Sequence, residues 1–319
     1  MIRLCSILVF LLLAFQASAQ AYPGRAVRIV VPFAAGGAVD LLARLTAGKM
    51  AEGFGQPVLV ENRVGAGGNL AADVVAKAAP DGYTILLTTN GLAISPALYR
   101  KLPFDAARDF VPVTQLVASH LLLVANPKFP ASSVAELIAA AKAKPGQLNC
   151  GSTGVGNPLH LTMELFKLSA GIDLVAVPYQ GDAPLNTALM SGQVEVAIVP
   201  FSTALPLIKA GRIRALAIAS ARRANALPEV PTIAEAALPG FESNSWQGFF
   251  VPARTPRDIV DAIQRETVKA LNAPDVRDRL IAIGVDMVGS TPEEFDARFK
   301  GDLAKFARIV KEARIPVQD

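Results

Sequence analysis

The stretch that decides the fold reads Val27-Arg28-Ile29-Val30-Val31-Pro32-Phe33-Ala34-Ala35-Gly36-Gly37-Ala38-Val39-Asp40. Its first part is an apolar, β-branched run, which is typical of a buried strand. A turn of small residues follows, and Leu41, Leu42 and Leu45 then recur at helical spacing. A strand, a glycine turn and a helix N-terminus place backbone N–H groups and the positive end of a helix dipole around the turn. The sequence therefore predicts a site for a small anion at this turn.

The residues before this stretch have the pattern of an export signal. Arg3 supplies a short positive region, Ile7–Phe15 is an uninterrupted apolar run, and Ala17-Ser18-Ala19 is a small-residue cleavage site. The apolar run is shorter than the roughly 20 residues that a membrane-spanning helix needs. We expect residues 1–19 to be a signal peptide cleaved after Ala19, and the mature protein to be soluble and periplasmic.

Length and composition restrict the class of protein. About 300 mature residues suit two domains of roughly 150 residues each. The net charge is +4, and no basic run with interleaved aromatic residues is present, so we expect no nucleic-acid partner. Removal of the signal leaves Cys150 as the only cysteine, which excludes an intramolecular disulfide and favours a buried, inert thiol.

Strand and helix patterns alternate along the chain, which predicts an α/β fold with parallel βαβ units. Ligands of such sheets bind beyond the carboxyl ends of the strands. The loops after the first three expected strands should therefore crowd one edge; they are Phe33–Gly37, Gly65–Asn69 and Thr88–Gly91. A second series begins near Val124 and has its own loops at 151–156 and 178–182.

Two long apolar runs, Val113–Ala125 and Ile213–Ala219, are the expected crossings between domains. Two crossings divide the chain into a discontinuous first lobe, residues 20–122 plus 221–319, and a continuous second lobe, residues 123–220. A ligand cleft should lie between the lobes. The last helix, expected to end near Glu312, should pack on the first lobe.

The residues offer little catalytic chemistry. The only histidines are His120 and His160, and no zinc-ligand spacing is present, so we expect no metal site and no cofactor. Gly65–Leu70 lacks the last glycine of a dinucleotide fingerprint, and Asn157-Pro158 replaces the lysine and hydroxyl residue of a P-loop. His120 lies in an apolar run and is expected to be structural, whereas His160 in the first turn of a helix is open to either role.

Five short sequence motifs, which occur in the same order along the chain, make it similar to a known family. They are Val31-Pro32-Phe33…Gly36-Gly37-x-x-Asp40, Val60-Glu61-Asn62-Arg63-x-Gly65-Ala66-Gly67-Gly68-Asn69, Ala78-Ala79-Pro80-Asp81-Gly82-Tyr83-Thr84, Val177-Pro178-Tyr179-x-Gly181 and Leu227-Pro228-x-Val230-Pro231-Thr232. Together they resemble the Bug family, the periplasmic substrate-binding proteins of tripartite tricarboxylate transporters. The resemblance covers essentially the whole mature chain. It implies two α/β lobes of the periplasmic-binding-protein fold, type II-like, joined by two crossing strands that act as a hinge.

The resemblance also implies a set of ligand-binding residues. They are Phe33, Ala34, Ala35, Gly36 and Gly37 on one wall, Thr88, Thr89 and Asn90 beside it, and Ser152, Thr153, Gly154, His160, Gly181, Asp182 and Ala183 on the second lobe. Two positions depart from the family pattern. Ala34-Ala35 replaces paired prolines, and Pro200-Phe201 stands where the family often has a polar residue, which indicates a ligand with a less polar tail. Asp182 is equally compatible with orienting a ligand amine and with capping its own helix.

The function implied is capture of a small mono- or dicarboxylate for uptake by membrane permease subunits, by a monomer that closes over its ligand. A ligand-sensing partner of a membrane receptor is a second hypothesis. A third, from another class, is a secreted hydrolase in which His160 activates Ser152. Trp246, the single tryptophan, is expected in the core, with the cleft wall as the alternative.

Overall fold

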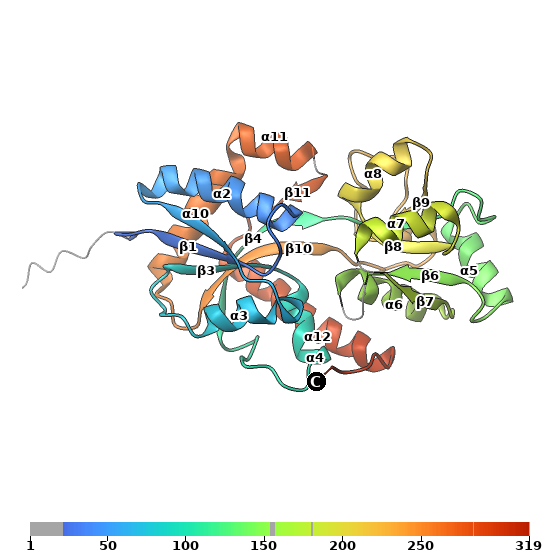
Figure 1. Cartoon of the computed structure of the whole chain (residues 1–319), viewed down its shortest axis with the longest axis horizontal. Coiled ribbons are helices and arrows are strands. Elements are labelled where there is room, and N and C mark those ends of the chain that lie inside the picture. The colour runs from blue at the N-terminus through green and yellow to red at the C-terminus, as the bar shows by residue number, and fades with distance from the viewer. Residues whose placement is uncertain (1–21, 154–156, 180, 283, 319) are drawn as a thin grey trace, which may run out of the picture.

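The computed structural model describes residues 22–153, 157–179, 181–282 and 284–318. The predicted signal peptide and residues 154–156, which include Gly154, lie outside these residues. Two sheets, one in each lobe, lie side by side along the long axis of the molecule (Figure 1). Among the described residues, no helix is both long and apolar enough to cross a membrane.

The sheet of the first lobe has the strand order β11-β4-β10-β3-β1-β2. Its strands are β1 (Val27–Val31), β2 (Val58–Asn62), β3 (Thr84–Thr89), β4 (Phe110–Ser119), β10 (Ser245–Pro252) and β11 (Val285–Met287). β1 pairs in parallel with β2 and β3, as the alternating pattern predicts. β10 runs antiparallel between β3 and β4, because it brings the chain back from the second lobe.

Helices cover both faces of this sheet, so β1 is buried on both sides. Val30 packs into one apolar cluster with Trp246 and Phe295, while Ile29 packs into the other with Leu42. The helices of this lobe are α2 (Ala38–Phe54), α3 (Asn69–Ala76), α4 (Gly91–Leu98), α10 (Arg257–Asn272), α11 (Pro274–Ala282) and α12 (Pro292–Glu312), with a 3₁₀ turn, η1 (Ala66–Gly68), before α3. Trp246 is fully buried, which confirms the expectation that it lies in the core.

The sheet of the second lobe has the order β7-β6-β8-β5-β9. Its strands are β5 (Leu121–Ala125), β6 (Asn149–Ser152), β7 (Val175–Pro178), β8 (Val196–Pro200) and β9 (Arg214–Ile218), and its helices are α5 (Val134–Ala143), α6 (Pro158–Ala170), α7 (Asp182–Ser191), α8 (Phe201–Lys209) and α9 (Ile233–Ala236). Cys150 lies in the core of this lobe, where burial raises the pKa of its thiol to about 12.

The chain crosses between the lobes twice. The first crossing is His120, the single residue between β4 and β5. The second lies immediately before β10, because Ser243 still donates its N–H to the carbonyl of Ala219 in the second lobe. Residues 221–242 therefore pack with the second lobe, where Ile233 and Phe241 join its core, and not with the first lobe as the sequence suggested. The apolar run 213–219 is β9 itself, paired with β5 inside the sheet, and not the crossing.

Candidate functional site

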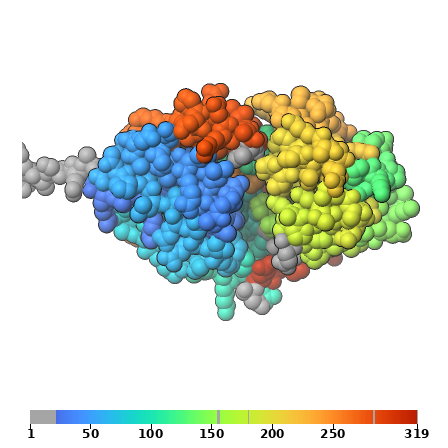
Figure 2. Space-filling model, turned by 45° about the horizontal axis from the view of Figure 1, so that its top comes forward, coloured from blue at the N-terminus to red at the C-terminus, as the bar shows by residue number. Residues whose placement is uncertain are grey.

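The space between the lobes forms a cleft of ≈320 Å³ (Figure 2). Its first-lobe wall contains Phe33, Ala38, Val39, Leu42, Ser119, Ser245, Gln247, Leu280, Gly284 and Val285. Its second-lobe wall contains Leu121, Thr153, Asn157, Pro158, Leu159, Asp182, Pro200, Phe201 and Ser202, and His120 lines it at the crossing. This volume is at the lower end of the range for small-molecule sites.

Four helices begin among the residues that line this cleft: α2 at Ala38, α6 at Pro158, α7 at Asp182 and α8 at Phe201. The N-termini of α2, α7 and α8 have no side-chain cap, so their first N–H groups are not satisfied by a cap. No lysine or arginine is among the described lining residues. Among the described lining residues, helix N-termini and their backbone donors are therefore the groups that favour an anion.

A buried carboxylate holds the first of these helices and the turn before it. Asp40, 2% exposed, accepts hydrogen bonds from the N–H of Gly36 (2.9 Å), from Nε of Arg44 (2.9 Å) and from Nδ2 of Asn62 (2.9 Å). Nδ2 of Asn62 also donates to the carbonyl of Phe33 at 2.9 Å. The bond from Arg44 is the main reason that the pKa of Asp40 is lowered to about 2. The turn is therefore shaped from behind by an ionised side chain.

Asp182 is the one acidic side chain among the described residues that line the cleft. Burial raises the pKa of this carboxyl group above its usual value. It is the first residue of α7 and not its cap, since Gly181 occupies the cap position with a φ of 99°. Asp182 therefore does not cap α7, and the capping role considered for it is wrong.

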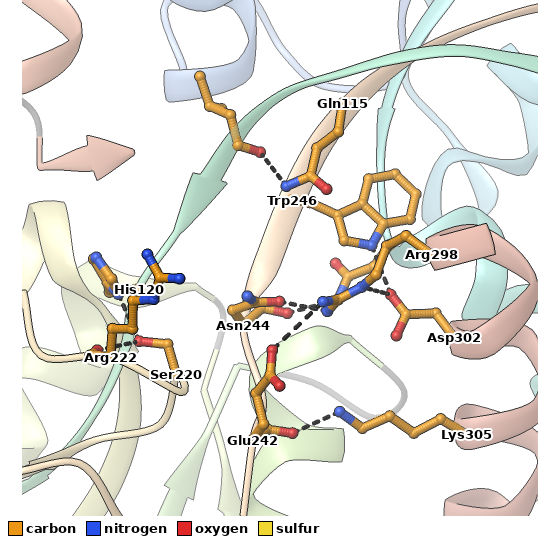
Figure 3. Close-up of polar contacts among 12 residues, drawn as sticks. Gln115, His120, Ser220, Arg222, Glu242, Asn244, Trp246, Arg298, Asp302 and Lys305 are labelled. Carbon is orange, nitrogen blue, oxygen red and sulfur yellow. Dashed lines mark hydrogen bonds and ion pairs between the residues drawn. The ribbon is translucent and has the colours of Figure 1, made fainter. Parts of the chain in front are cut away.

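The first crossing is joined to both lobes by side-chain bonds of His120 (Figure 3). His120 contacts the hydroxyl of Ser220 through Nδ1 (2.6 Å) and the carboxylate of Asp286 through Nε2 (2.9 Å). The ring thus has two polar partners, and His120, at 6% exposure, is buried at the first crossing. The structural role expected of His120 agrees with these contacts, although its ring also reaches the cleft wall.

The second crossing is held by α12. Arg298 donates Nη2 to Oδ1 of Asn244 at 2.6 Å and Nε to Asp302 at 3.1 Å (Figure 3). Asp302 also accepts from Nε1 of Trp246 at 2.7 Å. Successive residues of a strand point to opposite sides, so fixing Asn244 and Trp246 orients Ser245, which lines the cleft between them.

The chain matches the model of the tripartite tricarboxylate transporter family receptor over residues 42–315. The chain belongs to this family. Among curated proteins, it is 36% identical to Protein BugT of Bordetella pertussis, over 94% of this chain and 93% of that protein. The resemblance to the Bug family is thus confirmed.

Solved structures of the family have the same two-lobed fold. A structure described as R. palustris Rpa4515 with adipate has a TM-score of 0.80 and 37% identity, covering 93% of this chain and all of that one (100%). MatC (Rpa3494) from Rhodopseudomonas palustris with bound malate has a TM-score of 0.77 and 34% identity, covering 91% of this chain and 100% of that one. The expected fold class, an α/β periplasmic binding protein, is therefore confirmed, and these two related structures contain the dicarboxylates adipate and malate.

The structure brings some of the expected ligand residues to the cleft. Phe33, Thr153 and Asp182 line it, and Oγ1 of Thr153 accepts a bond from the side chain of Asn157. Phe33 also lines an adjoining hollow of ≈310 Å³ with Gly65–Gly68 and Thr89, so the loops after the first three strands do gather at one edge. Ala34, Ala35, Gly36 and Gly37 are exposed residues of the turn between the lining residues Phe33 and Ala38.

The other expected residues do not line the cleft. Thr88 is buried within the sheet, Asn90 bonds to the second crossing, and Ser152 is buried in β6. His160 is buried in α6, where burial lowers the pKa of its ring and Glu164 is 3.9 Å away. Gly181 caps α7, Ala183 is exposed in its first turn, and Gly154 lies outside the described residues. The hydrolase hypothesis therefore has neither Ser152 nor His160 at the cleft.

Sequence reasoning missed most of the polar residues that line the cleft. Ser119, Ser245 and Gln247 come from the ends of the strands beside the crossings. Asn157, which caps α6, was considered as a departure from the P-loop pattern and not as a residue of the cleft. The alternation of β10 could have located Ser245 and Gln247, because Trp246 between them was expected in the core. Pro200 and Phe201, the two residues that depart from the family pattern, do line the cleft.

Proposed function

We propose that this protein is the extracytoplasmic solute-binding component of a tripartite tricarboxylate-type transporter, and that it captures a small mono- or dicarboxylate between its lobes. The observation that carries the proposal is the convergence of four helix N-termini on a cleft without lysine or arginine among its described lining residues. Backbone donors at such termini neutralise a carboxylate without a buried cationic side chain.

The walls of the cleft favour a ligand with an apolar body. Leu42, Leu280 and Val285 line it from the first lobe, and Pro200 and Phe201 from the second. An aliphatic dicarboxylate presents acidic ends to the helix N-termini and a hydrocarbon chain to these side chains. The adipate and malate that the related structures bind are molecules of this class.

Capture proceeds by closure of the lobes. Because donors of both walls face the same space, a ligand gains all of its contacts only when the lobes approach, and this difference in contacts selects the closed state. The protein releases its ligand chemically unchanged to permease subunits of the membrane. It acts as a monomer in the periplasm after loss of residues 1–19.

A thermal-shift screen of the protein from Gln20 onward tests this function. The panel contains aliphatic dicarboxylates that include adipate and malate, monocarboxylates, amino acids and sugars. A ligand at a hundredfold excess over its dissociation constant stabilises the folded state by about 2.7 kcal/mol, which raises the melting temperature measurably. We expect a shift confined to carboxylates. A shift produced by the sugars alone would contradict the proposal.

A further inference from the structure

A second hollow with walls from both lobes lies apart from the ligand cleft. It has a volume of ≈470 Å³ and is bounded by the C-terminal half of α6, by the segment that follows α9, and by α12. We call it the α12 groove. Its polar side chains are those of Ser169, Glu242, Lys305 and Arg308, and none of the described residues that line it lines the cleft.

Lys305 places a cationic side chain in the α12 groove. Its Nζ donates to the carbonyl oxygen of Glu242 at 2.6 Å (Figure 3), and it forms no ion pair with any carboxylate in the described part of the chain. An ammonium group has three N–H donors, so two remain for another acceptor. Burial is the main influence on the pKa of Lys305 and lowers it, although the charges of Asp302 and Glu242 act in the opposite direction. The group thus pays a desolvation cost that a bound anion would offset.

Arg308 lies one helical turn after Lys305 on α12 and is exposed. Within the described ranges its guanidinium makes neither a hydrogen bond nor an ion pair. Glu242 supplies the one carboxylate among the described lining residues, and that group lies 3.5 Å from Nη1 of Arg298. The groove therefore combines two cations that form no ion pair among the described residues with a carboxylate that already has a partner.

We propose that the α12 groove is a second binding site, and that it takes a small, multiply charged anion held by Lys305 and Arg308. Residues three apart on a helix present their side chains about 5–6 Å from each other, so an anion with two charged oxygens can bind both. Arginine supplies a planar pair of donors suited to phosphate or carboxylate. Phosphate and polycarboxylates share this chemistry, and the test separates them.

The test is isothermal titration calorimetry at a constant ionic strength of about 0.15 M, where non-specific attraction is screened. Inorganic phosphate is the first probe and citrate the second, each balanced with chloride. Arg308→Gln removes one ligand at an exposed position, and Lys305→Gln/Arg308→Gln removes both. The matched control, Arg277→Gln/Lys311→Gln, removes the same charge from exposed positions outside the groove.

We expect saturable binding of one equivalent of phosphate, of citrate or of both. Arg308→Gln should weaken anion binding about tenfold, because the anion loses one charged hydrogen-bonding partner. The double variant Lys305→Gln/Arg308→Gln should abolish binding, and the control variant should bind as the wild type does. Citrate is also titrated into Ala38→Asp, which blocks the ligand cleft with a negative charge. The proposal is overturned if neither probe binds, if the double variant binds as the wild type does, or if the only binding is citrate binding lost in Ala38→Asp.

Discussion

Replacing Asp40 with asparagine tests how the turn that leads into α2 is held. Asp40 accepts three hydrogen bonds, two at Oδ2 and one at Oδ1. An asparagine there has one NH₂ group, which faces a donor in either orientation. We therefore expect Asp40→Asn to lower the free energy of unfolding and to weaken ligand binding, because Phe33 and Ala38 lose their support.

The magnitude follows from the pKa of Asp40. This pKa is about 2 in the folded protein, compared with about 3.9 in an unfolded chain, and each unit is worth about 1.4 kcal/mol. Because Arg44 is 52% exposed, screening reduces the contribution to about 1–2 kcal/mol. A lowered pKa means that this stability is present above about pH 4 and is lost as pH falls through about 2.

Urea unfolding at a series of pH values measures this effect. The difference in free energy of unfolding between wild type and Asp40→Asn should be largest at neutral pH and should shrink below about pH 4. The control is Asp261→Asn. In the wild type, the Asp261 carboxylate pairs at 2.7 Å with Arg257, four residues earlier on α10, and the side chains of Arg257 and Asp261 are 62% and 37% exposed. It should change stability by less than about 0.5 kcal/mol. Equal stability of Asp40→Asn and wild type at neutral pH would refute the reasoning.

Three further outcomes are expected. In urea unfolding, Gly248→Ala should lower the free energy of unfolding by about 1–3 kcal/mol, because the added Cβ would overlap the buried ring of Phe295. The control Gly48→Ala lies inside α2, where the added Cβ meets open space, and it should raise the free energy of unfolding by about 0.5–1 kcal/mol. Arg298→Gln should weaken ligand binding about tenfold in calorimetry, with the fold retained, because the second crossing loses its bond to Asn244; unchanged affinity would show that α12 does not orient the cleft wall. Asp182→Asn should strengthen dicarboxylate binding several-fold by removing a like charge, and weaker binding would indicate a ligand amine.

The fold was largely predictable because its signals are local. The β-branched run 27–31 and the glycine turn after it each determine their own conformation, and the structure contains both the strand and the helix that follows the turn. The second crossing was not predictable in this way. The run 213–219 is as apolar as a buried crossing, and only its pairing with β5 shows that it stays within the second sheet.

The site was predictable where backbone groups form it and less so where side chains do. Thr153 and Asp182 follow strands of the second lobe, so their place at the sheet edge follows from topology. Asn62 and Arg44 support the turn from β2 and from the next turn of α2, and only their convergence on Asp40 in space reveals that role.

The central claim is that one carboxylate ligand is held between both lobes, and calorimetry on a matched pair of wall variants tests it most directly. Ala38→Asp and Ser202→Asp place a negative charge in the first turns of α2 and α8, on opposite walls, where it favours the helices themselves. Ala135→Asp, in the first turn of α5 and away from the cleft, is the control. The account predicts that both wall variants lose at least about tenfold in affinity for the acid found in the screen, while the control keeps it. Full affinity in both wall variants would contradict it.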